Sequence, residues 1–438
     1  MKSSRLWEIL QSYVIRDGSL RTELVRGTVG SFGLKVINAL LNLALSIVLA
    51  RILAPEGYGI YAFAFSVMTL LAVPVQLGLP ALLVREVACY QYAAQWGLLR
   101  GILERANQAV LLLSLVIGLA AAWAVWWLME GMDVVQRATL GWALLLLPLG
   151  AFNRLREAAL QGLRQVVMGQ LPEKVLLPVV LLVLLGIVHL IAGLTPSLAM
   201  ALYCAAAASA FLAGAIMLLR ALPAEVRTVQ PQYDSRTWAR SVLPLSLLVG
   251  LHIINGQTGI FMLGLLATKE DVGLYRVAFS GAALVIFALS AVNAVLAPHI
   301  ARLHRAGDMV KLQRMVTQSA RLTFISALPV AGIFIIFGTP ILGFVFGEAY
   351  YGAYIPLIVL CIGQLVNASF NSVSLLLIMT RHEQESLKCL AISVIANVAL
   401  NAMLIPFLAA GGAAFATSAS LIIWRLTLAI VVRKKLRI

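Results

Sequence analysis

Polar and basic side chains interrupt several long apolar stretches of this chain at the spacing of helix turns. They are Lys35, Asn38 and Asn42 in one stretch, His252 and Asn255 in a second, and Asn367 and Asn371 in a third. Residues three, four or seven apart share one face of a helix, so each set predicts a polar stripe on an apolar surface. Lysine and carboxamide N–H groups are donors, and the chemistry they favour is the binding of an anionic ligand.

Each of these residues also has a simpler interpretation. Asn side chains in apolar helices often hydrogen-bond to a neighbouring helix, which contributes about 0.6–2 kcal/mol each. Lys35 could extend its ammonium to the nearer membrane surface, and His252 could pack between helices rather than carry protons. Arg51 and Arg276 lie near the other ends of their expected helices, where each fits an interface anchor or a cationic rim. The sequence leaves these alternatives open.

The composition places these stretches in a membrane. Hydrophobic residues make up 61% of the 438 residues, charged residues make up 12%, and the mean hydropathy is +0.96. Soluble domains carry about 45–50% apolar and about 25% charged residues. Apolar runs of about 20 residues follow one another, and each is long enough to cross about 30 Å of hydrocarbon. The sequence therefore predicts an all-α polytopic membrane protein.

An internal repeat predicts the architecture of that protein. The segment GIYAFAFS at 59–66 is echoed by GLYRVAFS at 273–280, an offset of 214 residues. We expect about 12 transmembrane helices in two pseudo-symmetric six-helix bundles around a central cavity. The expected units are an N-terminal bundle over 1–220 that starts with an amphipathic helix, a cytoplasmic linker over 221–240, and a C-terminal bundle over 241–438. The expected spans are 28–51, 58–83, 107–129, 138–161, 171–192, 196–219, 241–266, 272–298, 322–346, 352–379, 387–408 and 411–432.

The basic residues predict the orientation. Of the 33 Lys and Arg residues, Lys35 lies inside a span, and only Arg51, Arg137, Lys269 and Arg276 fall on one side of the membrane. The others, Arg425 among them, fall on the opposite side, which by the positive-inside rule is the cytoplasm and holds both termini. The net charge of +15 then reflects topology, and we expect no nucleic-acid partner.

The sequence gives little basis for catalysis or metal binding. It contains no P-loop, no HExxH and no GxSxG motif, and its four cysteines are scattered without a CxxC pair. We therefore expect no enzyme activity, no catalytic residue, no cofactor and no metal. The predicted spans contain only two carboxylates, Glu157 and Glu173, and the spacing of Arg154 and Glu157 predicts an ion pair within one helix. An interior rich in Lys, Arg and His favours an anion over a cation.

Three segments resemble the opening of the oligosaccharide flippases. They are GSFG at 30–33, LARILAPEGYGIY at 49–61 and LGLPALLVRE at 77–86. These flippases form the polysaccharide-transport branch of the multidrug/oligosaccharidyl-lipid/polysaccharide exporter superfamily. The resemblance implies a V-shaped cavity between spans 1–6 and 7–12. It also implies movement of undecaprenyl-pyrophosphate-linked oligosaccharide across the bacterial inner membrane, for surface polysaccharide biosynthesis.

The resemblance also bears on ligands and partners. It implies contact with membrane lipids and, as partners, a polysaccharide polymerase and glycosyltransferases. No family motif covers the polar residues of the spans, so the cavity residues are an expectation by analogy: Lys35, Asn38, Asn42, Arg51, His252, Asn255, Arg276, Asn367 and Asn371. Two alternatives remain open, a cation-coupled multidrug or metabolite exporter of the same superfamily and a membrane scaffold for a glycan-synthesis complex.

Overall fold

The computed structural model describes residues 20–128, 132–191, 193–286, 300, 303, 308–370, 373, 376–377 and 383–436. Within these residues the secondary structure is entirely helical, and nine helices are long and apolar enough to cross a membrane. Two of the nine, Gly30–Gln76 and Gln384–Lys434, are long enough to cross twice. The prediction of an all-α polytopic membrane protein is confirmed, and a count of about twelve spans is consistent with it. The expected amphipathic helix near the N-terminus lies largely outside the described residues.

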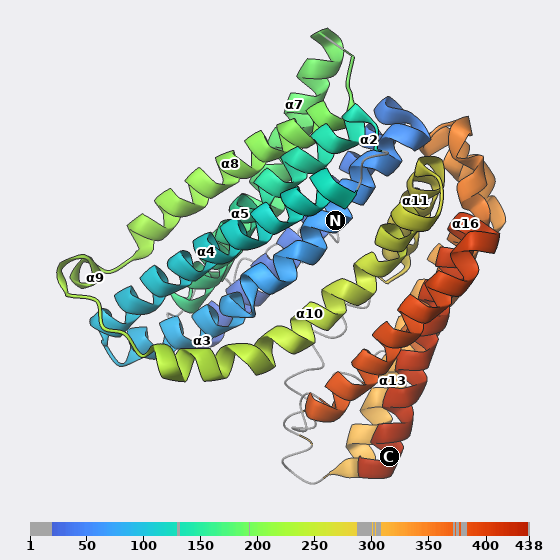
Figure 1. Ribbon diagram of the computed structural model, residues 1–438. Helices are drawn as coiled ribbons and strands as arrows, with labels where there is room; N and C mark the ends of the chain where they lie inside the picture. The colour runs from blue at the N-terminus through green and yellow to red at the C-terminus, as the bar shows by residue number, and fades with distance from the viewer. Residues whose placement is uncertain are drawn as a thin grey trace, which may run out of the picture.

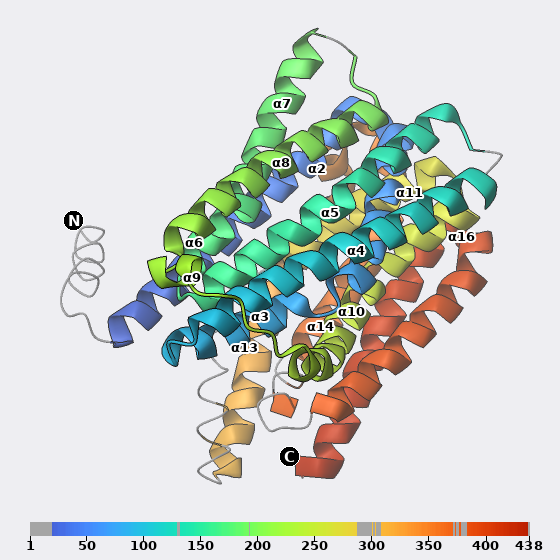
Figure 2. The same ribbon diagram turned by 60° about the vertical axis from the view of Figure 1, so that its left-hand side comes forward.

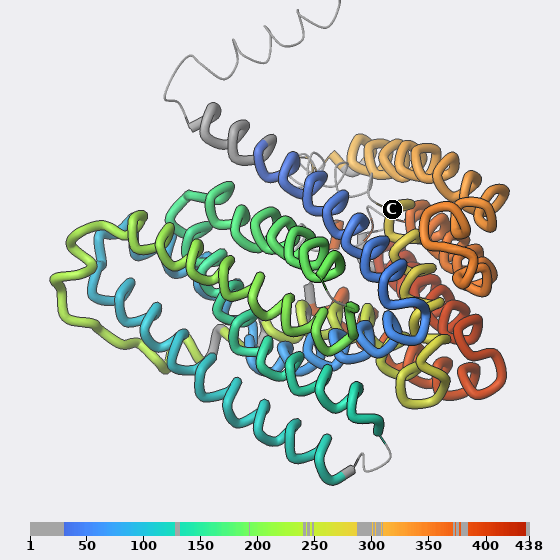
Figure 3. Tube along the Cα trace, turned by 90° about the horizontal axis from the view of Figure 1, so that it is seen from above, coloured from blue at the N-terminus to red at the C-terminus, as the bar shows by residue number. Residues whose placement is uncertain are grey.

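The helices form two groups with a shared seam between them (Figure 1). One group contains α2, α3, α4, α5, α7 and α8, and the other contains α10, α11, α13, α14 and α16; α2 packs against α10 and α11 across the seam. Figure 3 shows the same division from above. In chain order the elements are α2 (Leu20–Gln76), α3 (Leu79–Tyr92), α4 (Trp96–Leu128), α5 (Val134–Gly162), α6 (Val166–Leu171), the π-helical η1 (Pro172–Leu176), α7 (Leu177–Ile191), α8 (Pro196–Ala221), α9 (Ala224–Thr228), α10 (Ser235–Leu266), α11 (Lys269–Val285), α13 (Met309–Val345), the 3-10 helix η2 (Glu348–Ala353), α14 (Tyr354–Ser369) and α16 (Glu383–Leu436).

The two longest helices are each folded at one non-helical residue. In α2 this is Ala54, with φ 56° and ψ 172°, and in α16 it is Ala409, with φ 44°. A positive φ is costly for alanine, and the proline that follows Ala54 cannot donate a backbone hydrogen bond, so the helix reverses there. In α16 the two arms lie side by side (Figure 2) and the Ser393 hydroxyl donates to the Ser420 carbonyl across them at 2.8 Å. Each long helix is thus an antiparallel pair.

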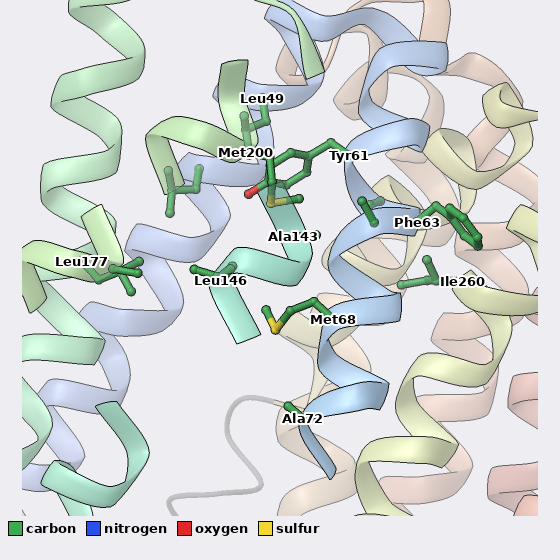
Figure 4. Close-up of a cluster of buried hydrophobic side chains, with 14 of the residues drawn as sticks. Leu49, Tyr61, Phe63, Met68, Ala72, Ala143, Leu146, Leu177, Met200 and Ile260 are labelled. Atoms are coloured by element: carbon green, nitrogen blue, oxygen red, sulfur yellow. The ribbon is translucent and has the colours of Figure 1, made fainter. Parts of the chain in front are cut away.

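The second arm of α2, from Tyr58 to Gln76, supplies the core of the seam. Figure 4 shows Tyr61 and Met68 pointing toward Met200 and Leu146, whereas Phe63 points toward Ile260 of α10. Phe63 also stacks on Phe261, with ring centroids 6.1 Å apart. Tight packing of this kind, rather than a hydrophobic driving force, holds helices together in lipid. The arm therefore contacts both groups of helices.

The segment between α8 and α10 is fastened to the first group. Arg100 of α4 donates to the carbonyls of Arg227 and Val229, both at 3.0 Å, and the Gln232 N–H donates to the Gly97 carbonyl at 2.9 Å. The helix α10 begins at Ser235, inside the predicted 221–240 linker. Residues 227–232 are thus held along α4 by hydrogen bonds.

Candidate functional site

The main cavity lies at the seam between the two groups of helices. Its volume is about 580 Å³, and its walls come from α2, α3, α5, α8 and α10 together with Glu173 and Leu177. Most of the lining is apolar, with Phe65, Met68 and Tyr203 among its larger side chains. The cavity extends along the second arm of α2 as far as Gln76. We call this the Gln76 end of the molecule, and the opposite end, at the reversal of α2, the Pro55 end.

The Pro55 end is closed by two glycines that belong to the sequence repeat. A Cβ added to Gly59 would lie 1.8 Å from the carbonyl oxygen of Lys269, and one added to Gly273 would lie 2.1 Å from that of Pro55. Lys269 precedes Gly273 by four residues, and Pro55 precedes Gly59 by four. The repeat offset of 214 thus appears in space as a reciprocal, two-fold-like contact between α2 and α11. Only glycine permits backbones to approach this closely.

Ion pairs and hydrogen bonds surround the glycine contact. Lys269 forms ion pairs with Asp133 and, at 3.7 Å, with Glu56. The hydrogen bond with the Asp133 carboxylate raises the pKa of Lys269. A capping box of Thr268 and Asp271 fixes the start of α11, and so holds Lys269 at its first turn.

Three further contacts join the two groups near the Pro55 end. Arg51 donates to the carbonyls of Phe344 and, at 2.7 Å, Val345, which are free at the C-terminus of α13. The Tyr350 hydroxyl donates to the Ala50 carbonyl at 2.9 Å, and the Ser46 and Ser280 hydroxyls lie 3.2 Å apart. The seal at this end combines the close glycine contact with polar contacts between the two groups.

Four charged residues form two ion pairs at the cavity wall. Arg154 pairs with Glu173 at 2.9 Å, and Lys174 pairs with Glu157 at 3.3 Å. The predicted pair of Arg154 and Glu157 within one helix is therefore wrong, because each prefers a partner on the neighbouring element. Arg154 and Glu173 both line the cavity, and the Arg154 side chain is 53% exposed. The cavity is less cationic than the sequence predicted, because the carboxylate of Glu173 lies beside the guanidinium of Arg154.

A local break in the helix positions these pairs. Residues 172–176 form a π-helical turn between α6 and α7, and it begins at Pro172, which has no N–H to continue the α-helical pattern. The turn places Glu173 and Lys174 opposite Arg154 and Glu157 of α5. The Asn38 amide donates to the Lys174 carbonyl at 2.8 Å and so secures the turn.

The predicted residues of α2 and α11 lie outside the cavity lining. Lys35 and Asn42 are exposed, and the Asn42 amide donates to the Asn38 carbonyl at 2.8 Å. Asn38 holds the π-helical turn and Arg51 holds the end of α13, as described above. Arg276 is half-buried. The roles of these residues in binding stay predictions.

In the C-terminal half the predicted residues divide in the same way. His252 lines the cavity. Asn255 is buried and receives a hydrogen bond from Asn397 at 2.8 Å, and Asn367 receives one from Arg425 at 2.6 Å. These two carboxamides join helices, as packing between helices would require. Asn371 lies outside the described residues.

Two features of the site do not follow from sequence patterns alone. Arg154 and Glu173 were noted for their charge but not brought to the cavity, because their pairing depends on how α5 meets the π-helical turn. Arg425 was counted among the residues of the cytoplasmic side, yet it is only 5% exposed inside the C-terminal half. Its position within the predicted span 411–432 was the available signal, since a charge inside a span usually has an interior partner.

Comparisons with known proteins agree with this architecture. A family model described as "Polysaccharide biosynthesis protein" matches residues 24–304. No curated protein matches the chain. Among solved structures, the chain is similar to an inward-facing multidrug resistance MATE family transporter of the MOP superfamily, with 15% identity, 94% of this chain and 98% of the other covered, and a TM-score of 0.77.

The chain is also similar to two further solved structures. The lipid II flippase MurJ in an inward closed conformation has 11% identity, covers 93% of this chain and 87% of its own, and gives a TM-score of 0.70. An outward-facing multidrug resistance MATE family transporter of the MOP superfamily has 17% identity and a TM-score of 0.61, with 96% of this chain and 95% of the other covered. At these identities the likeness shows a shared fold.

Proposed function

The chain belongs to the polysaccharide biosynthesis protein family, and from this premise we propose that it is a flippase for lipid-linked oligosaccharide. Its substrate would be an undecaprenyl-pyrophosphate-linked oligosaccharide, moved across the bacterial inner membrane for surface polysaccharide biosynthesis. The proposed mechanism is alternating access, in which residues 1–220 and 241–438 rock against each other and 221–240 connects them. A polysaccharide polymerase and glycosyltransferases are the proposed partners.

The observation that carries the proposal is the asymmetry of the seam. The two groups of helices are separated by a cavity at the Gln76 end and joined by glycine contacts and ion pairs at the Pro55 end. A carrier that binds substrate in a central cavity needs one closed and one open end, and must exchange them. Taking the basic side as cytoplasmic, the Gln76 end faces the cytoplasm, where the lipid-linked oligosaccharide is made.

Arg154 is the proposed contact for the pyrophosphate. It is the arginine of the cavity wall whose side chain remains half exposed, and a guanidinium binds phosphate oxygens through paired N–H donors. An incoming pyrophosphate would compete with Glu173 for it. Lys35, by contrast, is exposed away from the lining and stands as a secondary proposal.

The proposal can be tested in a strain that lacks the gene. We expect lipid-linked glycan to accumulate on the cytoplasmic face of the membrane, and the intact gene to relieve that accumulation. Arg154→Met should fail to relieve it at wild-type abundance, whereas Arg220→Met, which removes an exposed arginine at the end of α8, should succeed. A normal distribution of glycan in the deletion strain, with no second flippase present, would refute the proposal.

One observation favours a second candidate, a cation-coupled exporter of drugs or metabolites. Glu173 lines the cavity, and its Oε2 atom is buried without a hydrogen-bond partner, so it offers a carboxylate to a proton or cation. Expression should then confer drug resistance that disappears when the ion gradient is collapsed or when Glu173 is changed to Gln. Resistance unaffected by both treatments would exclude this candidate.

A further inference from the structure

The C-terminal half contains a buried guanidinium that has no carboxylate partner among the side chains that the structure describes. Arg425 of α16 is 5% exposed, and its Nε donates to the Asn367 side-chain oxygen at 2.6 Å. Among the described residues it takes part in no ion pair. A buried charge that lacks a counter-charge is costly in a membrane interior, and such charges usually have a partner or a ligand.

Five of the six carboxylates of this half have other partners or lie at the other end of the molecule. Residues 241–438 contain only Glu270, Asp271, Asp308, Glu348, Glu383 and Glu385. Asp308 pairs with Lys311 and Glu385 pairs with Lys388, while Asp271 caps α11. Glu270 and Glu348 lie at the Pro55 end, beside Lys269 and Tyr350. The side chain of Glu383 lies outside the described part of the chain, and the experiment below includes it.

Two unpaired donors lie next to each other at this position. Arg425 Nη1 and the indole Nε1 of Trp424 are both buried, and neither has a hydrogen-bond acceptor. The guanidinium carbon of Arg425 lies 4.3 Å from the centre of the Trp424 ring, so the two side chains are stacked. A buried donor without an acceptor costs about 1–3 kcal/mol, and more when charged. An acceptor with a negative charge would remove the cost at Arg425, and one within reach of both N–H groups would remove both costs.

Trp424 packs against His252, which lines the cavity. Trp424 meets His252 edge to face, with ring centroids 5.1 Å apart, and His252 lines the cavity wall. Trp424 is therefore in contact with a residue of the cavity wall.

We propose that Arg425 and Trp424 form a binding site for a small monovalent anion of the halide class. A single guanidinium is neutralised by one negative charge, whereas a phosphate dianion would leave a net charge buried in the membrane interior. The site is distinct from Arg154, which already has a carboxylate partner and lies across the cavity. The proposal does not depend on the flippase assignment.

The test is a thermal unfolding titration of the purified full-length protein in detergent, with chloride replacing gluconate at constant ionic strength. A ligand that binds only the folded state raises the melting temperature saturably. We expect this saturable rise in the wild type and in Arg433→Met, which removes an exposed arginine from the same helix. Arg425→Met should abolish it. If that variant does not fold, Arg425→Lys keeps the charge but loses the guanidinium geometry, and should weaken the apparent chloride affinity about tenfold or more.

A second readout uses the indole itself. Iodide should quench a saturable fraction of the tryptophan fluorescence. This quenching should be absent from Trp424→Phe, and chloride should reverse it in the wild type by displacing iodide.

Three outcomes would overturn the proposal. The first is the absence of saturable chloride dependence from both the wild type and Glu383→Gln, which would mean that ordered water satisfies both donors. The second is a chloride response that Arg425→Met retains. The third is a response absent from the wild type and created by Glu383→Gln, which would identify Glu383 as the counter-ion of Arg425.

Discussion

The two ends of the seam differ in what fills the space between the helix groups. At the Pro55 end, backbone meets backbone through Gly59 and Gly273, and Lys269 adds ion pairs around them. At the Gln76 end the same second arm of α2 faces a cavity whose charges, Arg154 and Glu173, neutralise each other on one wall. The closed end thus depends on close fit between the groups, and the open end on charges within one group. This difference is what the proposed alternating access requires of one of its two states.

The largest effect on the difference between the two ends is expected from a substitution that disrupts the glycine contact at the Pro55 end. Gly59→Ala would place a Cβ 1.8 Å from the Lys269 carbonyl, so the backbones must move apart. Overpacking typically costs about 1–3 kcal/mol, and because 1.4 kcal/mol is a factor of ten we expect transport to fall about tenfold or more. The measurement is the rate of glycan export at matched abundance.

The matched control for this variant lies on the same helix. Gly33→Ala adds a Cβ with no neighbour within 4 Å and should leave export unchanged. Equal export in the two variants would show that the glycine contact is not the seal.

The next largest effect is expected at the open end, from the ion pair of the cavity wall. Arg154→Met leaves the Glu173 carboxylate, whose side chain is 23% exposed, without its partner. Breaking a fully buried pair costs about 3–5 kcal/mol; because Arg154 is half exposed, we expect about 1–3 kcal/mol, measured as a lower thermal stability in detergent, together with loss of export.

A double variant separates the two roles of Arg154. Arg154→Met/Glu173→Gln removes both charges and should regain much of the lost thermal stability without regaining export. Recovery of export in the double variant would mean that Arg154 serves only to neutralise Glu173.

A smaller effect is expected from the ion pairs at the closed end. Lys269→Met removes pairs with Asp133 and Glu56 that are partly exposed to solvent, and such pairs contribute about 0–1 kcal/mol. The variant should shift the closed end toward opening by a few-fold, seen as faster labelling of a cysteine placed at Ser46. High salt should reduce the difference between variant and wild type.

The pH dependence of this pair has a definite sign. The pKa of Lys269 is raised in the folded protein, so its stabilisation is complete below the pKa of an unfolded lysine. It is lost as pH rises through the raised value. Labelling at Ser46 in the wild type should therefore approach that of Lys269→Met only in strongly alkaline solution.

The smallest effect on stability is expected from Lys35→Ala. The side chain is exposed, and exposed substitutions usually change stability by less than about 0.5 kcal/mol. Lower export at unchanged abundance would bring Lys35 into substrate binding in another state of the cycle. Wild-type export would leave Arg154 as the cationic contact.

The sequence predicted the fold better than it predicted the site. Hydropathy identified the membrane helices because each apolar run is long enough by itself to cross the bilayer. The sequence repeat contains Gly59 and Gly273, but the sequence does not show that the two glycines meet. In the structure Gly59 faces the carbonyl of Lys269, and Gly273 faces the carbonyl of Pro55. Spacing along one helix cannot show which residue of a second helix lies opposite.

The same limit explains the charged residues. Arg154 and Glu157 have ideal spacing for a pair, yet the π-helical turn at Pro172 offers each a nearer partner. Arg425 was predicted on the cytoplasmic side because it is a basic residue toward the end of a span. Only the packing of α16 against α14 shows that its side chain is buried. Positions set by tertiary packing were therefore the ones that sequence patterns missed.

The most direct test of alternating access is to lock the closed end. The hydroxyls of Ser46 and Ser280 lie 3.2 Å apart on the two sides of the seam, within reach of a disulfide after exchange to cysteine. The experiment compares glycan flipping in proteoliposomes by Ser46→Cys/Ser280→Cys, in a background whose four native cysteines are replaced, before and after oxidation. We predict that oxidation stops flipping and that a reductant restores it. Undiminished flipping by fully cross-linked protein would contradict the account.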